Sequence, residues 1–168
     1  MPVFLFTIHS YRSWRVDNPR GYVESGKGIL PPNERLAEAH DRLASEEPAL
    51  FGPSEQQVLA WIAWDVCRLR EWRLHGIAME PTHAHLLVSW KGVTRMPSVC
   101  AKIKNLISLE LNRRRAKSRK WLSRGASRKQ VKNRRHFDHL MKVYLPKHGG
   151  LVWIEGMPPP EPPASADG

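Results

Sequence analysis

The first residues that suggest chemistry are two histidines, His83 and His85, at the start of an apolar run. The run is short and follows Pro81, which is typical of a strand that begins after a tight turn. Side chains on a strand alternate between its two faces, so both imidazoles point to one face and the apolar residues between and after them point to the other. Neutral imidazole is a common metal ligand, and two of them on one strand make half of a small metal site. Two half-exposed histidines without a ligand explain the same spacing equally well.

The wider segment Pro81–Val88 (PTHAHLLV) resembles the His-hydrophobe-His (HUH) motif of single-tyrosine transposases, especially the REP-associated tyrosine transposases. Members of that family usually carry Met-Pro-Asn-His-x-His before a Leu/Val run. Here Glu80 intrudes before the proline, and Thr82 stands where Asn is usual. The resemblance implies a divalent metal held by His83 and His85, Mg²⁺ or Mn²⁺, and a catalytic tyrosine on a later helix.

A tyrosine that matches this requirement is Tyr144. The segment Val143–His148 (VYLPKH) resembles the family's catalytic helix, in which Asn, Gln or His follows the tyrosine by four residues. Positions i and i+4 share a helix face, so Tyr144 and His148 can point into one site. The resemblance makes Tyr144 the nucleophile and His148 the third metal ligand, whereas Tyr144 taken alone is better explained as a partly buried core residue. Pro146 removes a helix hydrogen bond, so we expect a kink there.

The charge of the chain indicates the class of partner. The 168 residues carry a formal net charge of +11, which favours a polyanion, nucleic acid first and an anionic membrane second. Residues 102–135 hold 14 of the 27 basic residues and one acid, Glu110. A helix C-terminus would account for one or two cations, so this density favours a phosphate-binding surface.

The predicted nucleic-acid contacts all lie in this segment. They are Lys102, Lys104, Arg113, Arg114, Arg115, Lys117, Arg119, Lys120, Trp121, Arg124, Arg128, Lys129 and Lys132. For Trp121, stacking on a base and packing in the core are equally good explanations.

The elements that must position these groups follow from apolar periodicity and capping residues. Strands are predicted over 3–9, 75–79 and 84–90, and helices over 34–45 with Asn33 as N-cap, 54–71 with a Ser54/Gln57 capping box, 97–114, and 134–148 with Asn133 as N-cap. Residues 120–123 and 129–132 are expected to pair as a ribbon that turns at Gly125, and 151–154 to close the sheet edge or cover the core.

The order strand, helices, strand, strand, helix suggests an α+β fold, a ferredoxin-like (split βαβ) antiparallel sheet with helices on one face. The histidines would then lie on the open face. The family that the chain resembles is built on this fold, so both lines of reasoning agree.

Length and composition favour one domain with a buried core. We expect a single HUH transposase-like domain over 1–156, with an irregular and helical insertion at 15–53 and a disordered Pro-rich tail at 157–168. No apolar run approaches the roughly 18 residues of a membrane span, and no secretory signal is evident, so we expect a soluble cytoplasmic protein. Cys67 and Cys100 are expected to be buried free thiols.

The resemblance implies a metal-dependent endonuclease and strand transferase that cleaves hairpin-containing single-stranded DNA through a 5′-phosphotyrosine, as in DNA transposition and recombination. We expect this protein to act as a monomer. A homodimer is also possible, because related insertion-sequence transposases work as dimers. The alternative is a domesticated, catalytically silent descendant that binds structured DNA or RNA through the basic segment. A ferredoxin-like RNA-binding module is a third class, but it would place aromatic rings on the central strands where His83 and His85 stand.

Overall fold

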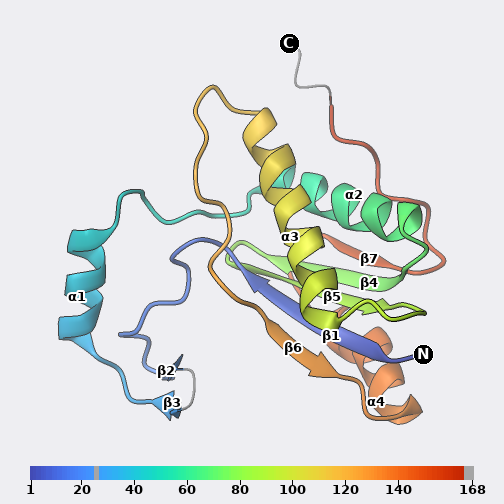
Figure 1. Cartoon of the computed structure of the whole chain (residues 1–168), viewed down its shortest axis with the longest axis horizontal. Coiled ribbons are helices and arrows are strands. Elements are labelled where there is room, and N and C mark those ends of the chain that lie inside the picture. Colours follow the sequence, from blue (N-terminus) through green and yellow to red (C-terminus); the bar gives the residue numbers. More distant parts are fainter. Residues whose placement is uncertain (25–26, 165–168) are drawn as a thin grey trace.

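The computed structural model describes residues 1–24 and 27–164 and has a mixed α+β fold (Figure 1). Its main sheet has five strands in the order β6-β1-β5-β4-β7, and every neighbouring pair is antiparallel. These strands are β1 (Val3–His9), β4 (Arg73–Glu80), β5 (His83–Ser89), β6 (Ser127–Gln130) and β7 (Val152–Ile154). The three strands predicted from apolar runs are confirmed, and residues 152–154 close the sheet edge as expected.

Two long helices, α2 (Pro53–Leu69) and α3 (Met96–Arg113), cover one face of this sheet (Figure 1). Each presents an apolar stripe, so that Leu59 and Ile103 are buried together with Phe6 and Val88 from the strands. The chain order β1-α2-β4-β5-α3-β6, with β1 and β5 adjacent at the centre, is the split βαβ arrangement. The predicted ferredoxin-like fold class is confirmed.

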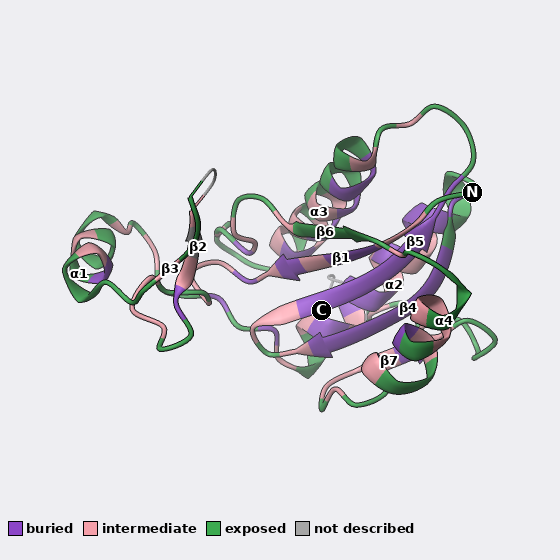
Figure 2. Cartoon of the chain, turned by 90° about the horizontal axis from the view of Figure 1, so that it is seen from below, coloured by how far each residue is buried: buried purple, intermediate pink, exposed green. Residues whose placement is uncertain are grey.

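The second face of the sheet carries the tyrosine helix. Helix α4 (Arg134–His139) continues directly into a π-helix, η1 (Leu140–Tyr144), and lies against this face (Figure 2). A second, smaller core forms here from Leu5, Ala78 and Leu87 of the sheet together with residues 140 and 145 of the helical segment. The face that carries the histidines is therefore partly covered, and the tyrosine helix is anchored beside them.

Residues 15–53 form an excursion at one end of the sheet. They contain the short hairpin β2 (Tyr22–Glu24) and β3 (Gly28–Leu30) and the helix α1 (Glu34–Leu43), whose N-cap Asn33 accepts a hydrogen bond from the Leu36 N–H as predicted. In Figure 1 this part lies beside the main body. Its assignment as an insertion stays a prediction.

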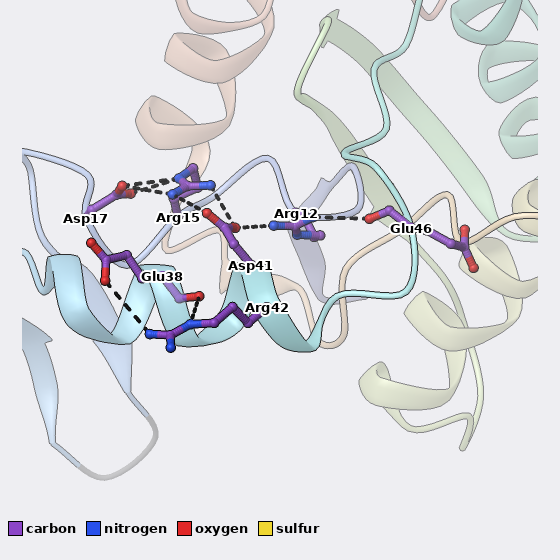
Figure 3. Close-up of polar contacts among 7 residues, drawn as sticks. All are labelled: Arg12, Arg15, Asp17, Glu38, Asp41, Arg42 and Glu46. Atoms are coloured by element: carbon purple, nitrogen blue, oxygen red, sulfur yellow. Dashed lines mark hydrogen bonds and ion pairs between the residues drawn. The ribbon is translucent and has the colours of Figure 1, made fainter.

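An arginine cluster ties the excursion together (Figure 3). The Arg15 guanidinium bonds Asp17 at 3.0 Å and Asp41 of α1 at 2.9 Å. Arg12, which follows β1, also bonds Asp41 and donates to the Glu46 carbonyl at 3.1 Å. These bonds connect α1 and the residues after it to the segment that follows β1.

Two local predictions are wrong. Gly52 is the N-cap of α2 and Pro53 takes its first position, so Ser54 already lies inside the helix and makes no capping box. Strand β6 pairs with β1 rather than with residues 120–123, and Leu122 forms only an isolated bridge with Ser10. The free edge of the seven-residue strand β1 accepts β6 in four residue pairs, which joins β6 to the main sheet.

The C-terminal segment 157–164 runs as an extended chain, and residues 165–168 of the predicted tail lie outside the described residues. The Trp153 indole N–H donates to the Pro158 carbonyl at 2.8 Å, and Arg114 donates to the Ala164 carbonyl. The expected disorder of the tail stays a prediction.

Cys67 and Cys100 are buried free thiols, as expected. Burial raises the pKa of both, that of Cys67 to about 12, so neither is ionised at neutral pH. Among the described residues, no helix has the length and apolar character that a membrane crossing requires.

Candidate metal and tyrosine site

The structure brings the three predicted metal ligands together. His83 and His85 lie on one face of β5, and His148 reaches them from the turn after η1. One nitrogen from each ring lies within 4.8 Å of the others. In the antiparallel register Thr7 lies opposite His85 and His9 opposite His83, so β1 supplies the neighbours of both histidines on this face.

Each imidazole has an oxygen next to its Nδ1 atom. The Thr82 hydroxyl lies 3.0 Å from Nδ1 of His83, and the Thr7 hydroxyl lies 2.8 Å from Nδ1 of His85. His148 Nδ1 lies 3.1 Å from the Leu145 carbonyl, to which it can donate. Such partners fix the orientation and the tautomer of metal-binding histidines. The carbonyl can only accept, so this bond leaves Nε2 of His148 for a ligand. A threonine hydroxyl can donate or accept, and the tautomer in which His83 and His85 donate from Nδ1 leaves their Nε2 atoms for a ligand as well.

Tyr144 enters the same cluster. Its hydroxyl lies 3.2 Å from Nε2 of His85, and its ring centroid is 5.1 Å from those of His85 and of His148. The helical segment that carries Tyr144 ends before Pro146, which lies in the following turn. The segment is widened at its end, because the Leu145 N–H bonds the Leu140 carbonyl five residues back, at 2.9 Å. Proline lacks an N–H and crowds the carbonyl four residues earlier, and π-turns are common at functional sites.

The electrostatics favour neutral imidazoles at His83 and His85. Burial, and then the nearby His83 and His148, lower the pKa of His85 to about 3, and its exposed fraction is 4%. Burial also lowers the pKa of His83. A metal ligand must be a neutral imidazole, so His83 and His85 need not lose a proton to bind a cation at neutral pH. Burial raises the pKa of Tyr144, so its phenol is protonated there.

Three imidazole donors fit a divalent transition metal. Of the two predicted ions, Mn²⁺ accepts imidazole more readily than Mg²⁺, which prefers oxygen ligands. A shallow pocket of about 490 Å³ opens beside the cluster and is lined by Glu80, Lys147, His83 and His148 among others. The Glu80 carboxylate accepts the Gly149 N–H at 2.8 Å. The chemistry of the donor set is therefore suitable for a cation, with room beside it for a substrate.

Most of the predicted nucleic-acid contacts are exposed side chains. Strand β6 projects them to both faces of the sheet: Lys129 lies opposite Leu5 and shares the face of the histidines, whereas Arg128 lies opposite Phe6 on the other face. The exposed members of the set are Lys102, Arg113, Arg115, Lys117, Lys120, Arg124, Arg128, Lys129 and Lys132. These nine remain candidates for phosphate contacts.

The other four members of the set are less exposed and are held by internal contacts. Lys104 donates to the Ser123 carbonyl at 2.8 Å and to that of Gly125, and Arg114 bonds Glu110 at 2.9 Å. Arg119 donates to the Glu47 carbonyl at 2.7 Å. Trp121 is 3% exposed, and its indole N–H donates to Asn112 at 3.0 Å. The structure thus favours packing over base stacking for Trp121.

Sequence reasoning missed Thr7. Nothing in the sequence of β1 marks this threonine, because its role depends on the register that pairs it with His85. Thr82 was noticed only as a departure from Asn, although its hydroxyl has the reach to bond the neighbouring His83.

Comparisons with known proteins complete the description. No family model matches the chain, and no curated protein sequence matches it. A similar solved structure is that of a REP-associated tyrosine transposase bound to a REP hairpin, with 12% sequence identity and a TM-score of 0.48. The match covers 82% of this chain and 61% of the other, so the chain spans less than two thirds of the length of that transposase.

Proposed function

We propose that this protein is a metal-dependent nuclease and strand transferase that cuts hairpin-containing single-stranded DNA through a covalent bond to Tyr144. One observation carries the proposal: the Tyr144 hydroxyl lies 3.2 Å from Nε2 of His85, within a cluster of three histidines whose ligand atoms are mutually within 4.8 Å. A nucleophile and a set of metal ligands thus converge on one point at the protein surface.

His85 serves this reaction as a ligand rather than as a base. With its pKa lowered to about 3, it is too weak a base to take the phenol proton. The Tyr144 hydroxyl and a metal would compete for the same Nε2 lone pair, so metal binding frees the hydroxyl to face a phosphate. A bound divalent cation supplies polarisation of the scissile phosphate and stabilises the charge that develops on it.

The bond changes balance without a co-reactant. The phenol oxygen attacks phosphorus, the O–P bond to Tyr144 forms, and the P–O3′ bond breaks. The phenol proton passes to solvent in the open pocket, and the leaving 3′ oxygen takes one to become a 3′-OH. Lys147, whose ammonium lies 4.6 Å from the Tyr144 ring centroid, favours the negative charge on the phenol oxygen. Attack by a 3′-OH on the phosphotyrosine reverses the step without ATP.

The rest of the chain supports this substrate class. The nine exposed members of the predicted contact set offer a phosphate-binding surface, and Lys129 extends it to the face of the histidines. Tyr144 and all three histidines come from one chain. We propose a monomer as the catalytic unit.

The test is a denaturing gel with labelled single-stranded hairpins, among them palindromes from the DNA that flanks the gene. Wild-type protein with Mn²⁺ or Mg²⁺ is expected to give a slow, protease-sensitive covalent band that is lost with EDTA and in Tyr144→Phe. Tyr144→Phe should still bind the hairpins in a native gel. Hairpin binding without a covalent band, across metals and substrates, would instead favour a nucleic-acid-binding protein without nuclease activity.

A further inference from the structure

A second pocket lies on the same face of the sheet, at the other end of the tyrosine helix. Its volume is about 760 Å³, and Arg73, His75, Gln130, Arg134, Phe137 and Glu155 are among the residues that line it. None of these residues contributes to the histidine cluster. The pocket combines an aromatic ring, two arginines and a carboxylate.

The wall of this pocket is held by a buried histidine. His75 is 5% exposed, and its Nε2 lies 2.8 Å from the Ser89 hydroxyl. Its Nδ1 lies 3.0 Å from one carboxylate oxygen of Glu155, whose other oxygen accepts the Arg73 guanidinium at 2.6 Å. Phe137 of α4 packs edge-on against the His75 ring, with centroids 5.1 Å apart. The polar groups at the pocket mouth are therefore fixed in place before any ligand arrives.

The chain Ser89–His75–Glu155 has the hydrogen-bond order of a hydrolase triad, but Ser89 is fully buried. A nucleophile must reach its substrate, so this network is better explained as a support. Two groups of this network reach solvent: the Arg73 guanidinium, whose side chain is 59% exposed, and the Glu155 carboxylate, whose side chain is 35% exposed.

We propose that this pocket binds one unpaired base of the DNA strand that Tyr144 cleaves. Single-stranded nucleic acid is commonly held by an aromatic side chain that stacks on a base and by cations that contact the backbone. Phe137 supplies the ring. The exposed Arg134 supplies a cation: its guanidinium lies over that ring, 5.6 Å from the centroid, and pairs with Asp138 at 2.9 Å. Arg73 and Glu155 offer hydrogen-bond donors and an acceptor of the kind that read base edges.

The position of the pocket suits the same strand. Ser89, which hydrogen-bonds the lining residue His75, lies four residues from His85 along β5. At the rise of a strand, this separation is about 13 Å. That length corresponds to about four stacked nucleotides. Phe137 and Tyr144 stand on one continuous helical segment, α4 and η1. A DNA strand with one phosphate at Tyr144 can therefore place the base of a nucleotide a few positions along in this pocket. This inference rests on the proposed function.

The experiment measures binding without cleavage. Tyr144→Phe protein, in EDTA, is titrated with a labelled DNA hairpin that has single-stranded arms, and each arm position is replaced in turn by an abasic site. At one position the loss of the base should weaken binding about 5- to 160-fold, which is the range for one stacked base. With Phe137→Leu added, the same abasic site should change the affinity less than about twofold.

A pair of arginine variants provides the matched control. Arg73→Gln removes an arginine that is 59% exposed and pairs with a carboxylate inside the pocket. Arg68→Gln removes an arginine that is 55% exposed and pairs with a carboxylate on α2, outside the pocket. The first should weaken binding of the intact strand and the second should not. Equal effects of the two, or abasic effects that are absent or unchanged by Phe137→Leu, would overturn the inference.

The two proposals fail in different ways. If the wild-type protein forms the covalent product but no abasic position weakens binding, the base-binding pocket is refuted and the cleavage reaction is not. A base effect that depends on Phe137, without a covalent product under any metal, would sink the cleavage reaction and leave the pocket as a base-binding site.

Discussion

The Thr7 hydroxyl lies 2.8 Å from Nδ1 of His85, across the central pair of strands β1 and β5. Through this bond the Nδ1 proton of His85 can be donated to the threonine oxygen, which leaves Nε2 as the acceptor that faces Tyr144. The Thr7–His85 contact thus links the central strand pair to the orientation of the most buried imidazole in the candidate site.

Replacing this hydroxyl should loosen the metal. Thr7→Val keeps the shape and the β propensity of the side chain but removes the hydrogen bond, and loss of such an outer partner typically costs about 10- to 100-fold in metal affinity. Titration calorimetry with Mn²⁺ measures the effect. Thr94→Val, in the turn before α3, is the control. Equal Mn²⁺ affinities of Thr7→Val and the control would show that Thr7 does not orient His85.

Pro146 should matter for cleavage more than for stability. In Pro146→Ala residue 146 regains an N–H and no longer crowds the carbonyl four residues back, so the widened turn can revert to an α-helix and turn Tyr144 by about 100°. We expect single-turnover cleavage at least about tenfold slower and a melting temperature that does not fall. Pro53→Ala, at the start of α2, is the matched proline control. Unchanged cleavage would show that the π-helix does not position the nucleophile.

The basic segment should set the salt dependence of DNA binding. The triple change Arg113→Gln, Arg115→Gln and Lys117→Gln removes three exposed cations. Each lost contact with single-stranded DNA reduces the slope of log K against log salt by about 0.7, so we expect a slope smaller by about 2. Fluorescence anisotropy from low to moderate salt gives this slope.

The control for that measurement removes the same charge elsewhere. Arg20, Arg35 and Arg42 are exposed residues of the excursion 15–53, and their triple change to Gln should leave the slope nearly unaltered. If both triple variants reduce the slope equally, net charge rather than a local surface governs binding.

Acid should destabilise the fold in part through His75. Burial lowers the pKa of His75 in the folded state, against the opposing effect of Glu155. As pH falls through the unfolded value of about 6.5, the unfolded chain therefore binds a proton that the folded chain does not, and stability is lost. Urea unfolding at pH 7.5 and 5.5 should show a smaller loss for His75→Gln than for wild type. His40→Gln, which removes an exposed imidazole, is the control, and a loss in His75→Gln equal to that of wild type contradicts the prediction.

Local patterns predicted much of this fold. The apolar runs give β1, β4 and β5, and Asn33 and Asn133 cap their helices as expected because an N-cap bond spans only three residues. The alternation of His83 and Ala84 between faces follows from strand geometry alone. The convergence of Tyr144 with the histidines is what the family resemblance implies, and the roles of these residues stay proposals.

The features that the sequence did not reveal depend on partners far along the chain. The pairing of β6 with β1, and of Thr7 with His85, is decided by which strand edge is free and in which register it pairs. The π-helix reflects a balance between the restriction that Pro146 imposes and the packing of Leu140 and Leu145 against the sheet. The apolar periodicity of a short segment does not reveal these features.

The central claim is a covalent bond between DNA and one side chain, so the most direct measurement is peptide mapping of the trapped product. Wild-type protein, a hairpin substrate and Mn²⁺ are incubated, the covalent band is digested with nuclease and trypsin, and the peptides are analysed by mass spectrometry. The peptide Val143–Lys147 contains Tyr144 and no other hydroxyl side chain. The proposed reaction predicts a 5′-linked nucleotide on this peptide. A nucleotide on any other peptide, with Val143–Lys147 unmodified, would contradict it.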